Sequence, residues 1–361
     1  MYRTSYILIV FSGFFLNFLP VSPIYLFFFL SLIGVFLYSL KNQELHFNHL
    51  TGLTLILLGY LIITQIMINE DKTNAIYNVI ISLIYFILTF ASIHKLETEK
   101  IIKISKSFIN VSILLLIVEA IWRISHPWYP TTLWYMTQVD SSFYKYKMNS
   151  IMYQDSNFVG IFIISLFFFC VYLKLNHAIT LRWQMIVLAS LCGLTFSRAA
   201  IITLVAFYIL LGIRSKAMKG LMILLSMLFG FVFLINYIDD DISFLSKLDI
   251  IDRTITFMKH ASISEIAIGI GFGNAFKYLQ IGAHNFIVTY LIESGVIGLF
   301  LLLLLWWKIL RSTKFKAGII MIPFLVSGMS LAGHAITYLY CIFAIIYILE
   351  KRKEISMDVV S

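Results

Sequence analysis

The side chains best suited to chemistry gather in short polar stretches of an otherwise apolar chain. One stretch, GIGFGNAFKYLQIGAHNF at residues 269–286, alternates three glycines and closes near His284 and Asn285. Successive backbone N–H groups in a glycine turn can form an anion-binding concavity. Histidine is the side chain best suited to proton transfer near neutral pH. The alternatives to these two functions are a flexible connector for the glycines and a structural role for the histidine. The elements around the stretch are needed to choose between them.

The alternating glycines, Gly269, Gly271 and Gly273, also invite a nucleotide-binding interpretation. That interpretation requires a preceding strand and a following helix within a soluble βαβ unit. The surrounding sequence provides no such unit and therefore disfavours it. Glycines also allow a sharp turn, or a close approach of the backbone to a neighbour or a ligand.

Arg198, in the stretch LTFSRAAIITL, separates two apolar runs with almost no loop between them. A charge at membrane depth is costly unless it is paired or hydrated, so it usually marks a site. The planar guanidinium suits bidentate binding of phosphate oxygens. The alternative is an arginine at a tight turn that reaches the lipid headgroups with its long side chain.

Two acidic residues lie within apolar runs. Glu119 and Arg123 share a helix face, which predicts a self-neutralising pair that fixes helix packing. Glu293 follows Asn285 on nearly the same face of another helix. We expect Glu293 either to hydrogen-bond across helices or to orient the His284 region.

Other polar groups are weaker candidates. His334 also lies at an outer boundary and rivals His284, whereas His126 and His260 have less support. The run 239–241 holds three aspartates, which suggests a metal-bound diphosphate. Consecutive carboxylates just after a span more often form a solvated helix exit, so we predict no metal site.

Composition defines the elements that must position these residues. The chain has 361 residues, of which 60% are hydrophobic and 12% charged, and its mean hydropathy is +0.93. A soluble domain carries about twice that charged fraction. The apolar runs are continuous and do not alternate with period two, which predicts transmembrane helices and not a barrel. Cys170, Cys192 and Cys341 lie inside apolar runs, which indicates buried core residues without a disulfide framework.

About a dozen runs are long enough to cross a bilayer as helices. We place the spans at 5–19, 22–40, 50–68, 76–93, 108–125, 158–175, 183–197, 199–213, 220–238, 284–307, 317–332 and 335–349. Most Lys and Arg residues then fall on the side of the two termini, so the positive-inside rule places both termini in the cytoplasm. The net charge of +9 thus reflects topology, and we expect no nucleic-acid partner.

We expect one transmembrane domain over residues 1–361, with two long extracytoplasmic segments at 126–157 and 239–283. Irregular backbone in membrane proteins lines water-filled cavities, so the working face is expected there. The aromatic residues of HPWYPTTLWYM, in the first segment, fit either an interfacial belt or a surface that stacks on sugars. Nucleotide sugars are not available on that face.

Four polar stretches follow one another along the chain: QDSNFVGIF at 154–162, TFSRAA around Arg198, DRTITFMKH around Arg253, and GIGFGNAF followed by AHNFIVTYLIESGVIG. This order, within about twelve spans, resembles the O-antigen polymerase and O-antigen ligase superfamily. The topology matches over nearly the whole chain, and the motifs match over residues 154–162 and 195–298.

The resemblance implies a membrane-embedded glycosyltransferase of GT-C-like architecture in the bacterial inner membrane. It would polymerise undecaprenyl-diphosphate-linked oligosaccharide repeat units at the periplasmic face, without a nucleotide sugar, metal or cofactor. The implied partners are the lipid-linked glycan, the lipid bilayer, a flippase and a chain-length regulator. The sugar, the linkage and the type of surface polysaccharide are not predicted.

In that family, loop arginines hold the diphosphate and a histidine serves the acceptor hydroxyl. By motif position these residues are Arg198, Arg253 and His284, with His284 as the general base. The substrate-binding residues implied beside them are Asp155, Asn157, Gly271, Gly273, Asn285 and Glu293.

Two other functions stay open at this point. An O-antigen ligase would use the same donor but transfer the polymer to lipid A-core. A flippase or another transporter would show internal repeats and a midplane site, and we find no matching pattern between the two halves of the chain.

Overall fold

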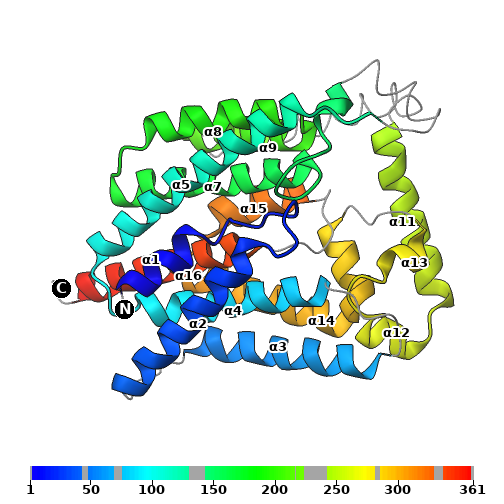
Figure 1. Cartoon of the computed structure of the whole chain (residues 1–361), viewed down its shortest axis with the longest axis horizontal. Helices are drawn as coiled ribbons and strands as arrows, with labels where there is room; N and C mark the ends of the chain where they lie inside the picture. Colours follow the sequence, from blue (N-terminus) through cyan, green and yellow to red (C-terminus); the bar gives the residue numbers. More distant parts are fainter. Residues whose placement is uncertain are drawn as a thin grey trace.

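The computed structural model is a bundle of helices (Figure 1) and describes residues 2–42, 48–68, 75–129, 143–215, 217–222, 242–280, 285–328 and 336–358. The described residues form helices and their connections, with no β-strand among them. The elements are α1 (Tyr2–Val10), α2 (Pro23–Asn42), α3 (His49–Met67), α4 (Ala75–Ile93), α5 (Thr98–Ser125), η1 (Phe143–Tyr146), α7 (Ser156–His177), α8 (Arg182–Leu194), α9 (Arg198–Gly212), α11 (Ile242–His260), α12 (Ile263–Ile268), α13 (Ala275–Leu279), α14 (Phe286–Ser312), α15 (Gly318–Ser327) and α16 (Thr337–Asp358).

Within these ranges, six helices are long and apolar enough to cross a membrane: α2, α3, α4, α5, α7 and α14. They coincide with six of the expected spans, and they support a polytopic, all-helical membrane protein. A further three apolar helices, α8, α9 and α15, are shorter. The expected span at 220–238 lies almost entirely outside the described residues.

The first expected span differs from the helix observed. Helix α1 ends at Val10, and the chain then turns through residues 11–13. The Ser12 hydroxyl bonds back to the carbonyl of Ile9, and a side chain at Gly13 would collide with Phe162. Local hydrogen bonding and packing therefore end the helix inside a run that hydropathy alone cannot divide.

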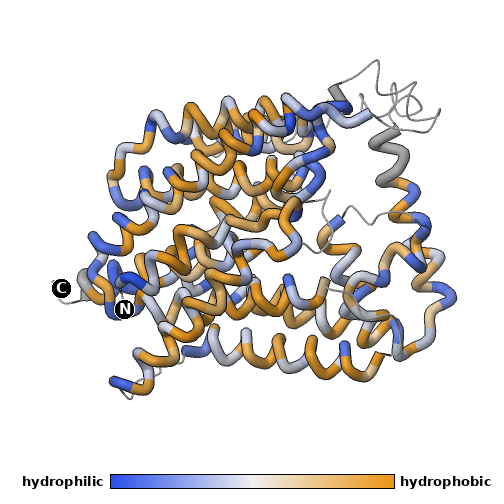
Figure 2. The backbone as a smooth tube through the Cα atoms, viewed as in Figure 1, coloured by the Kyte–Doolittle hydropathy of each residue, from blue (hydrophilic) through white to orange (hydrophobic). Residues whose placement is uncertain are grey.

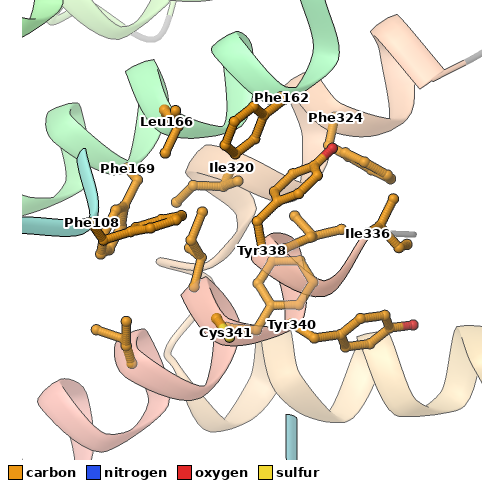
Figure 3. Close-up of a cluster of buried hydrophobic side chains, with 14 of the residues drawn as sticks. Phe108, Phe162, Leu166, Phe169, Ile320, Phe324, Ile336, Tyr338, Tyr340 and Cys341 are labelled. Carbon is orange, nitrogen blue, oxygen red and sulfur yellow. The ribbon is translucent and has the colours of Figure 1, made fainter. Parts of the chain in front are cut away.

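Helix α7 is the most buried of these six long helices, along nearly its whole length. Figure 3 shows Phe162 of α7 beside Tyr338 of α16, and Phe169 of α7 beside Phe108 of α5. Peripheral helices such as α2 instead expose large apolar side chains, as expected for lipid-facing surfaces. Figure 2 shows the same apolar character along the helices of the bundle, with hydrophilic residues towards its ends. The three cysteines are free and buried, as predicted.

The two ends of the bundle differ in their elements. The beginning of α1 and the end of α16 lie at one end, and α11, α12 and α13 lie at the opposite end (Figure 1). The terminal end carries a buried carboxylate, Glu350, which accepts hydrogen bonds from the Tyr172 hydroxyl at 2.7 Å and the Lys316 ammonium at 2.5 Å. Burial lowers the pKa of the neighbouring Lys353, an effect that Glu350 opposes. The end opposite the termini holds the segments that the motifs single out.

Candidate functional site

The glycine turn after α12 is built around one carboxylate. Gly269, Gly271 and Gly273 all have positive φ angles, 81°, 85° and 87°, a region that glycine adopts at little cost. The Gly273 N–H donates to Oε1 of Glu293 at 2.9 Å, and the Ala275 N–H donates to the same oxygen at 3.3 Å. The carboxylate of α14 therefore lies inside the concavity that the turn forms.

The remaining N–H groups of the turn are also bonded. The N–H of Ile270 donates to the carbonyl of Ile292, and that of Gly271 donates to the carbonyl of Glu293. The N–H of Phe272 donates to Oε1 of Gln65, on α3, at 3.0 Å. The N–H groups of Gly271 and Gly273 are thus satisfied internally, and the expected anion-binding concavity is filled by Glu293, which is only 4% exposed.

The turn also makes a close backbone contact with α14. Gly295 has a positive φ of 69° and kinks that helix. A Cβ atom on Gly269 would lie 2.6 Å from the Gly295 nitrogen, and a Cβ on Gly295 would lie 2.6 Å from the Gly269 nitrogen. The Tyr60 hydroxyl donates to the carbonyl of Ser294 at 2.9 Å, next to the kink. Glycine is needed here for close approach to a helix of the bundle.

Asp155 and Asn157 open α7 beside the Arg198 turn. Asp155 caps α7 by accepting from the Asn157 N–H at 2.8 Å and from the Asn157 side-chain amide at 3.1 Å. The intervening Ser156 donates its hydroxyl to the carbonyl of Thr195 at 2.7 Å. The QDSN and TFSR motifs, far apart in sequence, are therefore joined at the ends of two helices.

Arg198 is the first residue of α9, where Ser197 is the N-cap and accepts from the Ala200 N–H. Gly160 of α7 allows this turn to approach closely, because a Cβ there would lie 2.8 Å from the Ala200 Cβ. The Arg198 side chain is exposed. It is thus presented at a fixed helix terminus, three residues after Thr195, whose carbonyl bonds Ser156 at the start of α7.

The predicted Glu119–Arg123 pair is confirmed and is fully buried. The Nε atom of Arg123 lies 2.8 Å from Oε1 of Glu119, and the two side chains are 0% and 1% exposed. Arg123 also donates to the carbonyls of Tyr146 and Leu194. It thereby ties α5 to η1 and to the end of α8, which leads into the Arg198 turn.

Arg253 lies on α11 and belongs to a different cluster. Its Nε atom lies 3.0 Å from the carboxylate of Asp249, and its Nη1 donates to the carbonyl of Leu279, at the end of α13, at 2.9 Å. Helix α13 begins at Ala275, whose N–H bonds Glu293. This helix therefore connects Arg253 to the hydrogen bonds that Glu293 makes with Gly273 and Ala275, here called the Glu293 network. Arg198 and Arg253 lie on different elements, in separate clusters.

Asn285 is the N-cap of α14 and accepts from the N–H groups of Ile287 and Val288. His284 precedes this cap and lies outside the described residues, as do His334 and the aspartates at 239–241. Within the part of the chain that the structure describes, no three His, Cys, Asp or Glu side chains gather in a way that could hold a metal ion.

Sequence reasoning missed Gln65 and Tyr60. Both lie in α3, and both contact the glycine turn or the kink beside it. A lone amide inside an apolar span was the available signal, because a buried amide requires hydrogen-bond partners. Which partners it takes depends on tertiary contacts more than two hundred residues away along the chain.

Comparison with known protein families found no matching family, and comparison with characterised proteins found no significant relative.

Proposed function

We propose that this chain is a membrane-embedded glycosyltransferase that polymerises lipid-diphosphate-linked oligosaccharide repeat units on the outer side of the bacterial cytoplasmic membrane. The hydrogen bond between Ser156 and Thr195 is the observation that carries this furthest. It joins the QDSN motif to the TFSR motif, and Asp155, Asn157 and Arg198 lie at the starts of the two helices concerned, α7 and α9.

In the proposed reaction, Arg198 binds the diphosphate of the donor and stabilises the charge that develops on it as the glycosyl bond breaks. His284 accepts the proton of the attacking sugar hydroxyl on the acceptor repeat unit. The chain passes from the lipid diphosphate to that hydroxyl, and the lipid diphosphate leaves. Direct displacement at the anomeric carbon inverts its configuration.

The Glu293 network has a supporting role in this proposal. The N–H groups of Gly273 and Ala275 bond the Glu293 carboxyl group, so in this proposal they do not contact the diphosphate of the donor. Asn285, on the same helix, caps the first turn directly after His284. Glu293 and Asn285 thus hold α14, the helix that directly follows His284 in the sequence.

A reconstitution experiment tests the proposal. Purified protein given only undecaprenyl-diphosphate-linked repeat units should build a ladder of polymers, with no lipid A-core present. A protein that is inactive until lipid A-core is added is a ligase. Net movement of lipid-linked oligosaccharide across liposomes without a ladder would identify a flippase instead.

A further inference from the structure

A cavity of about 400 Å³ lies on the outer segment, between the second half of α11, the start of α12 and the end of α13. It is separate from the Arg198 cluster. Its lining includes Arg253, Phe257, His260, Glu265, Tyr278 and Gln280. This volume falls in the range of small-molecule sites.

The lining combines two aromatic rings with polar groups of several kinds. The rings of Phe257 and Tyr278 pack edge to face, with centroids 5.5 Å apart. Both pack against a small buried cluster that contains Ala275 and Leu279. This buried cluster therefore fixes the positions of the two rings, and such preorganisation favours binding.

The charges argue against an anion in this cavity. Arg253 is the one Lys or Arg in the lining, and the carboxylate of Asp249 already lies 3.0 Å from its Nε. Glu265 adds a second carboxylate to the surroundings. With His260 counted as neutral, Arg253 faces the two carboxylates of Asp249 and Glu265, so a diphosphate would meet no net positive charge. A neutral ligand rich in hydroxyl groups would find both donors and acceptors.

We propose that this cavity is a subsite for one sugar ring of the glycan, with Phe257 and Tyr278 against the ring's C–H face and Arg253, Glu265 and Gln280 bonding its hydroxyl groups. The proposal rests on the proposed function, and it assigns Arg253 to the carbohydrate and not to the lipid diphosphate. The helices that line the subsite, α11, α12 and α13, lie at the end of the bundle opposite the chain termini (Figure 1). There the subsite can hold the glycan beyond the bilayer while Arg198 holds the diphosphate.

Saturation-transfer NMR on the full-length protein in nanodiscs tests the subsite directly. The probes are the methyl glycosides of glucose, galactose and N-acetylglucosamine. At least one should receive saturation, and Tyr278→Ala should weaken its binding roughly tenfold. Phe276→Ala is the matched control, because Phe276 is on the same helix, is 65% exposed and does not line the cavity. Absence of binding by all three glycosides, or an equal loss in both variants, overturns the subsite.

A second variant distinguishes sugar from anion. Glu265→Gln should preserve the cap of α12, because glutamine also serves in a capping box. At a sugar subsite it should weaken glycoside binding, and pyrophosphate should not displace the glycoside. Displacement by pyrophosphate, or tighter pyrophosphate binding in Glu265→Gln, identifies an anion site and overturns the proposal.

The polymer ladder separates the two proposals. A ladder made by a wild-type protein that shows no cavity-dependent glycoside binding overturns the subsite and leaves the polymerase standing. Glycoside binding that depends on Tyr278, in a protein that forms no ladder, supports the subsite and removes the polymerase.

Discussion

At the scale of single residues, Arg198 carries the proposed donor contact. Replacement by alanine should abolish polymer formation while the protein level stays normal, because an exposed side chain at a helix start contributes little to packing. Arg198→Lys should rescue poorly, since an ammonium lacks the planar fork that binds two phosphate oxygens. Ladder formation by membranes of equal protein content measures both variants. Full activity of Arg198→Ala would remove the residue from the site.

His284 should behave as a base and not as a binding residue. His284→Ala is expected to lower the polymerisation rate about 10²- to 10⁴-fold, while lipid-linked donor still binds. Single-turnover kinetics and donor binding, measured on the same preparation, separate the two effects. His334→Ala serves as the comparison and should retain most activity; the opposite pattern would move the base to His334.

Glu293 should be replaceable by an acceptor but not by an apolar group. One oxygen, Oε1, accepts the N–H groups of both Gly273 and Ala275, so the amide oxygen of Glu293→Gln can replace it. Glu293→Leu leaves two N–H groups without an acceptor, at a cost of about 1–3 kcal/mol each. Thermal unfolding in detergent should therefore show a near-wild-type midpoint for the first variant and a clear loss for the second. Equal losses would mean that the charge itself is required.

At the scale of elements, Arg123 joins α5, η1 and α8. Arg123→Met leaves the buried Glu119 unpaired and should destabilise the protein by about 3–5 kcal/mol. The double variant Glu119→Leu, Arg123→Met removes both charges and should be more stable than the single one. Unfolding midpoints of the three proteins decide this. A double variant less stable than Arg123→Met would show that the carboxylate has another role.

The elements also show what sequence can and cannot reveal. Hydropathy located the six long helices, because about 20 continuous apolar residues have few alternatives to a span. The Glu119–Arg123 pair was predictable because helix geometry alone brings the two residues together. The kink at Gly295 was not, since a glycine within a span does not by itself indicate a kink and only the glycine turn opposite makes it necessary. Gln65 was missed for the same reason, because its partner comes from another part of the chain.

At the scale of the whole molecule, the orientation in the membrane can be measured. The native cysteines are buried, so introduced thiols can report alone. In intact spheroplasts, Ser264→Cys on α12 should react with a membrane-impermeant maleimide, and Lys103→Cys on α5 should not; both positions are exposed. The expectation follows from the excess of basic residues on the terminal side. Labelling of position 103 alone would invert the topology and move the proposed site to the cytoplasm.

The mutual contact of Gly269 and Gly295 has a consequence for how this protein can change over time. A side chain on either glycine would collide with backbone atoms of the other segment, and a second substitution cannot restore the space because both Cβ atoms would enter it. We therefore expect both positions, twenty-six residues apart, to stay glycine in any variant of this protein that keeps the turn and the kink.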